Sequence, residues 1–298
     1  MGLNIAAIQN TLELYNLGHL KNSKNVLEIG SQELHVKKAD LKQLFDNAGL
    51  KSDLVDEYPS NNWPEKPRCP AKYFYKSLGI KEYQSIDINA DHGAIPHDLN
   101  KPFEDRSKFN KFDIVTDHGS CEHVFNISEC YKTMHNLTKP GGYIIIAQAV
   151  LKGNGYFKFD GSFFDGIAAA NIYKIIFNSY VISTVKKTKN GSDYEFHIPR
   201  NRELFNALDF SKIDQLNVYG VLQKTKEDEF KIPYQGKLMK EMYNISEGFN
   251  RAYFKDPISY NYLPSSTLKV EEASFRLLIK ALIIKIRRII QISMSKKK

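Results

Sequence analysis

The sequence predicts an α/β fold in which helices cover both faces of a mostly parallel sheet. An apolar run over residues 25–29 ends in Gly30, and a helical pattern follows over residues 33–45. Further short apolar runs at 85–88, 112–117 and 143–148 alternate with loops and one clear helical pattern at 127–137. Alternation of this kind is typical of a doubly wound sheet, whose ligands bind beyond the carboxyl ends of the strands.

The segment Glu28-Ile29-Gly30-Ser31 predicts a tight turn after the first strand. Gly30 has no Cβ, so the backbone can turn sharply there and approach a ligand closely. A dinucleotide-binding fingerprint needs three spaced glycines, whereas Gln32 and Leu34 occupy the later positions here. The turn alone therefore does not specify a dinucleotide.

A polar motif follows or precedes each of the later predicted strands, in chain order. Asp87 ends the second strand, where an acid can accept hydrogen bonds from ribose hydroxyls. A His-Asp-Leu-Asn loop follows at 97–100, the fourth strand runs into a Glu-His-Val segment at 122–124, and a Lys-Pro-Gly-Gly turn at 139–142 precedes the next strand.

This succession of motifs resembles the class I S-adenosylmethionine (SAM) dependent methyltransferases over roughly residues 24–150. It is most similar to bacterial members that modify sugars and other small molecules. The resemblance implies a Rossmann-like sheet of seven strands, six of them parallel and the last, at 216–222, antiparallel. It also implies a methyltransferase domain over residues 1–230 and SAM as the cofactor.

The resemblance implies roles for residues at the strand ends. Gly30 and Ser31 would contact the methionine part of SAM, and Glu28 would order the turn and the methionine amino group. Asp87 would hold the ribose hydroxyls, and Asp98 with Leu99 would border the adenine. His118 and Gly119 would line the pocket after the fourth strand, and Ile88 is also expected to contact the cofactor.

His123 is the expected catalytic base, because imidazole titrates near neutral pH. Glu122 could orient a substrate hydroxyl or act as the base instead. Adjacent residues on a helix do not face the same way, so the alternative is a structural pair in which Glu122 is a cap. No compact metal-ligand spacing is present, and no metal is expected.

Three further segments are expected near the site. A helix over residues 3–20 would cover the cofactor. The proline-rich loop at 51–70 would form a lid in which Trp63 either stacks on a sugar or adenine or simply pins the loop. The glycine-rich segment after residue 151 would place Asn154 and Tyr156 at the mouth of the site, ahead of a helix at 162–177 and a strand at 180–185.

The C-terminal extension, residues 231–298, is expected to contain a basic amphipathic helix at 271–295. Such a helix suits an anionic membrane surface, and it equally suits docking on its own domain or on a dimer partner. The net charge of +8 lies largely in this region, which leaves the rest of the chain less basic. Oligomeric state is not indicated by the sequence.

The expected function is transfer of a methyl group to a hydroxyl of a sugar, glycolipid or related small molecule. An RNA methyltransferase and a non-catalytic binding protein are the alternatives; nucleic acid is not the expected partner, because no RNA-binding module or base-amine motif is present. The three cysteines form no Cys-x-x-Cys pair, which favours a reducing, cytoplasmic setting. Of the two alternatives for the C-terminal helix, membrane binding would place it at the inner face of the membrane.

Overall fold

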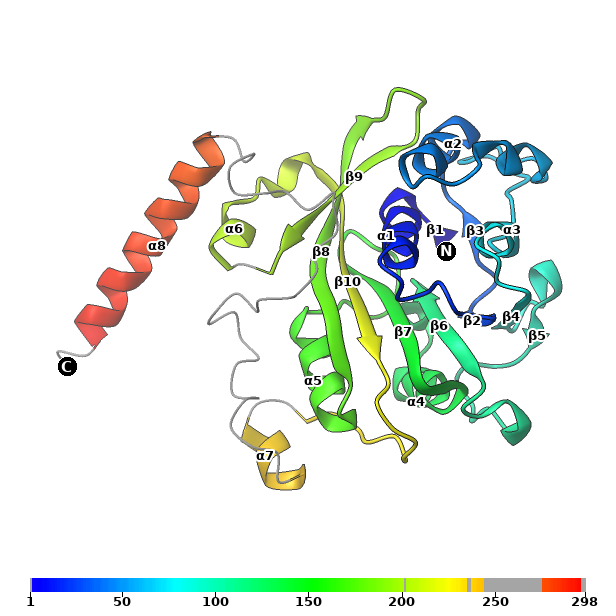
Figure 1. Ribbon diagram of the computed structural model, residues 1–298. Coiled ribbons are helices and arrows are strands. Elements are labelled where there is room, and N and C mark those ends of the chain that lie inside the picture. The colour runs from blue at the N-terminus through cyan, green and yellow to red at the C-terminus, as the bar shows by residue number, and fades with distance from the viewer. Residues whose placement is uncertain (1, 201, 235–236, 244–274, 296–298) are drawn as a thin grey trace.

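The computed structural model describes residues 2–200, 202–234, 237–243 and 275–295 (Figure 1). An eight-stranded sheet in the order β5-β4-β2-β6-β7-β10-β8-β9 forms the centre of the molecule. Its strands are β2 (Asn25–Ile29), β4 (Glu82–Asp87), β5 (Ile95–Pro96), β6 (Phe112–His118), β7 (Thr138–Leu151), β8 (Lys174–Lys187), β9 (Asp193–Pro199) and β10 (Ile213–Gln223).

The sheet is buried on both faces, as the continuous apolar runs predict. Ile145 packs in one core cluster with side chains of α1 (Ile5–Asn16), α2 (Lys38–Asn47) and α3 (Lys72–Ser77). Its neighbours Ile144 and Ile146 pack in the other, with side chains of α4 (Ile127–Leu137) and α5 (Ser162–Asn171). Because successive side chains of a strand point to opposite faces, one apolar run supplies both cores. The expected doubly wound, Rossmann-like architecture is confirmed.

The directions of the strands indicate the edge of the sheet at which a ligand would bind. β5, β4, β2, β6 and β7 pair in parallel, and β10 runs antiparallel to both β7 and β8. The chain passes from β2 to β4 on one side and then returns to β6 on the other, so the strand order reverses beside β2. Ligands of doubly wound sheets bind at this reversal, beyond the carboxyl ends of the strands.

The sheet has one strand more than predicted. β9 pairs antiparallel with β8, so that six strands share one direction while β10 and β9 oppose them. The turn between β8 and β9 docks on α2, where Thr188 and Asn190 donate to the Asp40 carboxylate at 2.9 and 3.1 Å. Long-range contacts of this kind are not visible in the sequence pattern.

The predicted helix at 33–45 begins later than expected. Glu33 and Leu34 form a short strand, β3, that pairs in parallel with Gly2–Leu3 (β1), and α2 starts only at Lys38. The side chain of Gln32 is fully buried and donates to the Ile29 carbonyl at 2.8 Å, which folds the turn inward. The helix therefore does not present its first N–H groups to the Gly30 turn.

Two other helices are shorter than predicted. α5 ends at Asn171, because Ile172 adopts a left-handed conformation (φ +55°) and residues 174–177 join β8 instead of extending the helix. α1 ends at Asn16 rather than at residue 20, and it is capped by Asn4, whose side chain accepts from the Ala7 N–H at 3.0 Å.

The loop at 51–70 contains one 3₁₀ helix, η1 (Ser52–Glu57), and otherwise runs irregularly, as its prolines predict. Asn61 holds it in place by donating to the Val36 carbonyl at 2.6 Å and accepting from the Cys69 N–H at 3.3 Å. Arg68 adds an ion pair with Glu33 at 3.1 Å. These contacts fix the loop beside β3.

The C-terminal region contains α7 (Lys237–Tyr243) and α8 (Phe275–Ser295), and α8 lies beside α6 (Arg202–Ala207) (Figure 1). The predicted helix thus forms from residue 275, and residues 271–274 lie outside the described part. Leu282, Ile286 and Ile289 on its apolar face are 56%, 47% and 55% exposed. No helix in the described ranges has both the length and the apolar character needed to cross a bilayer.

Candidate active site

The turn after β2 is held in a left-handed conformation that favours glycine. Gly30 has φ +88°, and its N–H donates to the Ile86 carbonyl at 2.8 Å. A Cβ at this position would lie 2.2 Å from the Oγ of Ser120, which follows β6. The turn is therefore packed directly against the end of β6, and the two strand ends form one continuous edge.

Asp87, at the end of β4, extends this edge on the side of β2 away from β6. Its carboxylate accepts from the Ser31 N–H at 2.8 Å and the Asn89 N–H at 3.3 Å, which ties the end of β4 to the turn after β2. Each carboxylate oxygen has two acceptor sites, so Asp87 keeps capacity for hydroxyl donors. The next residue, Ile88, is 72% exposed and presents an apolar side chain beside the acid.

Asp98 and Leu99 lie in the loop after β5. The loop is tied to the same edge by a bond of 3.2 Å from the His97 N–H to the Asp87 carbonyl. Asp98 accepts from the side chain and backbone of Asn100, and the side-chain bond is the largest cause that lowers its pKa. Leu99 packs against the core beneath.

Glu28 is placed differently from the other predicted cofactor residues. It is fully buried, accepts from the Tyr83 hydroxyl at 2.6 Å and the Thr116 hydroxyl at 3.3 Å, and does not line the cavity described below. Burial raises its pKa to about 7. A direct contact between this carboxyl and a ligand does not follow from its position, and its evident role is to join β2, β4 and β6.

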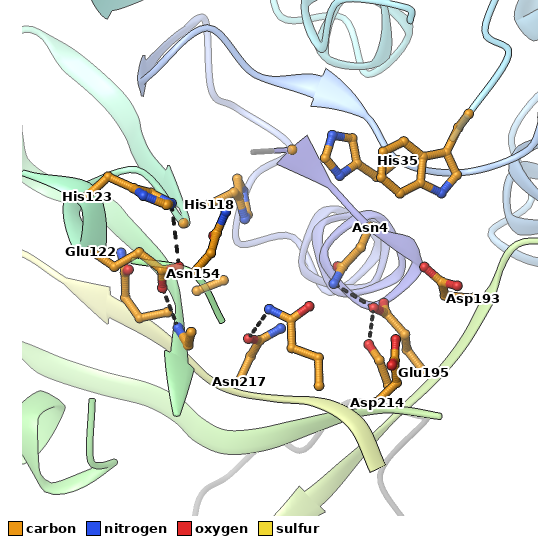
Figure 2. A pocket seen from close by; sticks show the side chains of 18 residues that line it. Asn4, His35, His118, Glu122, His123, Asn154, Asp193, Glu195, Asp214 and Asn217 are labelled. Atoms are coloured by element: carbon orange, nitrogen blue, oxygen red, sulfur yellow. Dashed lines mark hydrogen bonds and ion pairs between the residues drawn. The ribbon is translucent and has the colours of Figure 1, made fainter. Parts of the chain in front are cut away.

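A cavity of about 500 Å³ opens at the carboxyl ends of β6, β7 and β8, where β10 and β9 begin (Figure 2). Its lining is mostly polar and includes three histidines, four carboxylates and five side-chain amides. The lining residues are Gly2, Asn4, His35, Trp63, His118, Gly119, Glu122, His123, Ala147, Gln148, Ala149, Asn154, Ser183, Asp193, Glu195, Asp214, Gln215 and Asn217. A volume of this size suits a small-molecule ligand.

The predicted catalytic pair lies in the wall of this cavity. Glu122 and His123 belong to a 3₁₀ turn, η4 (Cys121–His123), and His123 Nε2 is 3.7 Å from Glu122 Oε1. The other oxygen of Glu122 accepts from the Ala149 N–H at 2.6 Å. Neighbours in the chain thus come together, because the tight turn and the anchor on β7 direct both side chains to one side (Figure 2).

His118 and Gln148 bring unsatisfied polar atoms to the same wall. His118 is 4% exposed, neither of its ring nitrogens has a partner in the described residues, and burial lowers its pKa to about 4. Gln148 is 1% exposed; its nitrogen donates to Asp117, whereas its Oε1 has no partner in the described ranges. Buried polar atoms normally have partners, so these three atoms point to a bound ligand or water.

The predicted substrate residues divide into two groups. Asn154 lines the cavity, on a segment anchored by a bond from the Phe157 N–H to the Glu122 carbonyl at 3.2 Å. Tyr156 on the same segment is 77% exposed and is not among the described lining residues. Trp63 lines the cavity, but its ring is stacked on His35 at 3.9 Å and lies 4.7 Å from the Arg68 guanidinium. The contacts favour the alternative in which the indole pins its loop.

The sequence predictions missed the half of the cavity formed by β9, the start of β10 and the N-terminus of α1. Glu195 on β9 accepts from Asn4 at 2.7 Å, from the Ala6 N–H at 2.9 Å and from Ser183 at 2.7 Å. Asp193 and Glu195 alternate along β9, a pattern that would have indicated one shared face had the strand been predicted.

Residues 80–194 match the family model of a methyltransferase domain. A search of curated proteins gives no match. Among solved structures, the chain is similar to a Burkholderia thailandensis 1,6-didemethyltoxoflavin-N1-methyltransferase with bound 1,6-didemethyltoxoflavin and S-adenosylhomocysteine, at 13% identity and a TM-score of 0.38, covering 74% of this chain and 79% of that one.

Two further structures show similar levels of likeness. A SAM dependent methyltransferase from Archaeoglobus fulgidus is 11% identical with a TM-score of 0.37, covering 74% of this chain and 94% of that one. A putative methyltransferase from Bacillus halodurans C-125 is 10% identical with a TM-score of 0.37, covering 73% and 99%. Likenesses this distant say nothing about the substrate of this chain.

The family match spans β4 through the beginning of β9, and it includes the end of β6 and the predicted catalytic pair, Glu122 and His123. It agrees with the motifs that follow the strands in order and with the strand reversal beside β2. The match of residues 80–194 to a methyltransferase domain confirms the resemblance to the class I SAM-dependent methyltransferases.

Proposed function

We propose that this protein transfers the methyl group of SAM to a hydroxyl of a sugar, glycolipid or related small molecule. The observation that carries the proposal is the adjacency of two sites. The edge formed by Gly30 and Asp87 meets the polar cavity at the end of β6, where Ser120 packs on the turn and His118 lines the cavity wall. A donor at the edge and an acceptor in the cavity would therefore meet near His118 and Gly119.

The residues along the edge fit SAM. Gly119 has φ +80° and open space where a Cβ would lie, so its backbone is accessible to a ligand. The exposed side chain of Ile88 offers an apolar surface for adenine, and Asp87 retains acceptor sites for ribose hydroxyls. Bound SAM supplies an electrophilic methyl group on a sulfonium, and this is the chemistry that the protein itself lacks.

His123 is the proposed general base. Its side chain is 35% exposed and lines the cavity, so an acceptor hydroxyl can reach it. On taking the hydroxyl proton, the imidazole becomes positively charged, and the Glu122 carboxylate at 3.7 Å stabilises that charge. Glu122 is thus a positioning residue, fixed in turn by the Ala149 N–H.

Titration with S-adenosylhomocysteine, the product, tests the cofactor site. We expect the wild-type protein to bind it and Asp87→Ala to lose binding, because the acid both orders the turn and faces the ribose. Asp46→Ala on the exposed surface of α2 is the matched control and should bind normally. A folded wild-type protein that does not bind would favour a non-catalytic role.

The catalytic role of His123 is tested separately. His123→Gln should keep S-adenosylhomocysteine affinity while lowering the turnover of a methyl acceptor by roughly 10²–10⁴-fold, the usual contribution of a general base. The acceptor is sought by screening sugars and glycolipids for SAM-dependent release of S-adenosylhomocysteine. Unchanged turnover in His123→Gln would assign the Glu-His pair to structure instead.

The exposed apolar face of α8 supports a second, accessory proposal. We propose that α8 binds an anionic membrane surface through this face and its basic residues, among which Lys280, Lys285 and Arg287 are exposed. Basic amphipathic helices bind such surfaces by combining apolar burial with attraction to anionic lipid. A membrane position would suit a glycolipid acceptor.

A further inference from the structure

The half of the cavity built by β9, the start of β10 and the N-terminus of α1 is not needed for the proposed proton transfer. It nevertheless contributes three of the four carboxylates that line the cavity, from Asp193, Glu195 and Asp214. Among the lining residues that the structure describes there is no lysine or arginine. The charge of this half is therefore expected to select among acceptors.

The three carboxylates differ in how they are compensated. Asp193 forms an ion pair with Lys187, and Glu195 is buried with three donors, while burial raises its pKa to about 7. Asp214 is exposed at the rim of the cavity and has no hydrogen-bond or ion-pair partner within the described ranges. Lys152 lies near this rim but donates to the Ile213 carbonyl. Asp214 is thus the carboxylate that is free to meet a ligand cation.

Independent evidence for a ligand comes from the buried wall opposite. The two ring nitrogens of His118 (Figure 2) and Oε1 of Gln148 are enclosed and lack partners in the described residues, and both side chains line the cavity. A neutral imidazole offers one donor and one acceptor, and an amide oxygen offers only acceptor sites. Hydroxyl groups, which both donate and accept, satisfy this combination, whereas a phosphate supplies acceptors only.

We propose that the acceptor is a polyhydroxylated compound that carries a protonated amine, as an amino sugar does, with the amine facing Asp214 and hydroxyls facing His118 and Gln148. This inference rests on the proposed function. Phosphorylated and nucleotide-linked sugars are disfavoured, because an anion in the cavity would meet carboxylates with no lining cation to offset them.

The test uses three matched probes on the full chain loaded with S-adenosylhomocysteine: glucose, glucosamine and glucose 6-phosphate, titrated calorimetrically at low salt. We expect glucosamine to bind about fivefold more tightly than glucose, the upper range for a solvent-accessible ion pair. Glucose 6-phosphate should bind most weakly. Added salt should narrow the difference between glucosamine and glucose, because it screens exposed charges.

Two variants locate the contacts. Asp214→Asn should remove the preference for glucosamine over glucose, whereas the matched control Asp46→Asn should keep it. Gln148→Leu should weaken glucose and glucosamine alike, because it removes a hydroxyl acceptor and leaves Asp214 in place. Gln148→Leu also removes the hydrogen bond that the Gln148 amide donates to Asp117, whereas Asp214→Asn leaves that bond in place.

The inference is overturned if glucose 6-phosphate binds as well as glucosamine, if none of the probes binds, or if Asp214→Asn keeps the preference. These outcomes differ from failure of the proposed function. A protein that does not bind S-adenosylhomocysteine fails at that earlier step, whereas one that binds it and then prefers the phosphate fails only here.

Discussion

Substitution of Gly30 by alanine tests whether the turn after β2 is packed against β6 as described. The new Cβ would lie 2.2 Å from Ser120 Oγ and 2.9 Å from Gln32 Nε2, at a backbone φ of +88°. The left-handed conformation costs an L-residue about 1–2 kcal/mol. Ser120 Oγ must move, although it donates to the Ile29 carbonyl at 2.6 Å and accepts from Gln32 at 2.8 Å.

Breaking these two buried hydrogen bonds leaves polar groups unsatisfied, at about 1–3 kcal/mol for each group. With two such groups, the total expected loss in the free energy of unfolding is therefore about 3–8 kcal/mol. Gly49→Ala is the matched control, because Gly49 also has a positive φ, +71°, but nothing lies within 4 Å of its added Cβ. That variant should lose only the conformational part, about 1–2 kcal/mol.

Urea unfolding followed by circular dichroism measures both variants, provided that the slope m is unchanged. Ser120→Gly in the Gly30→Ala background should regain part of the loss by making room for the methyl group. Equal destabilisation by Gly30→Ala and Gly49→Ala would refute the close packing of the turn on Ser120. It would also remove the adjacency on which the proposed function depends.

Two further predictions concern stability and localisation. Burial raises the pKa of Glu28 from 4.5 to about 7, so between these pH values the folded protein holds a proton that the unfolded chain has released. The free energy of unfolding should therefore fall as pH rises through this window, by at most about 1.4 kcal/mol per pH unit for this group. In urea unfolding at several pH values, Glu28→Gln should reduce this dependence of the free energy of unfolding on pH, whereas the exposed control Glu57→Gln should leave it unchanged. An unchanged pH dependence in Glu28→Gln would contradict the raised pKa of the buried acid. Removal of residues 271–298 should release the protein from anionic liposomes in a flotation assay without changing S-adenosylhomocysteine affinity, and equal flotation of the truncated chain would exclude α8 as the anchor.

The sequence by itself determined the parallel half of the fold. β2, β6 and the middle of β7 are buried on both faces, and such strands can be recognised because short clusters of apolar residues lie between turn signals. Turn chemistry is equally local, and Gly30 marked the end of β2. The Lys-Pro-Gly-Gly segment, predicted as a turn before the strand, instead lies inside β7, where the pairing with β6 shifts register. The strand-end residues Asp87, His118 and His123 followed from that order, since parallel strands bring their carboxyl ends to one edge.

Only the tertiary structure decided the other half of the site. β9 became a strand because the preceding strand, β8, offered it an edge and α2, which is far away in the sequence, held the turn between them. The same long-range packing carried Glu195 to the N-terminus of α1 and turned the segment after Gly30 into β3 instead of a helix. A pattern of residues reports local periodicity, whereas the pairing of distant strands and the burial of single polar side chains depend on contacts that form only when the chain is folded.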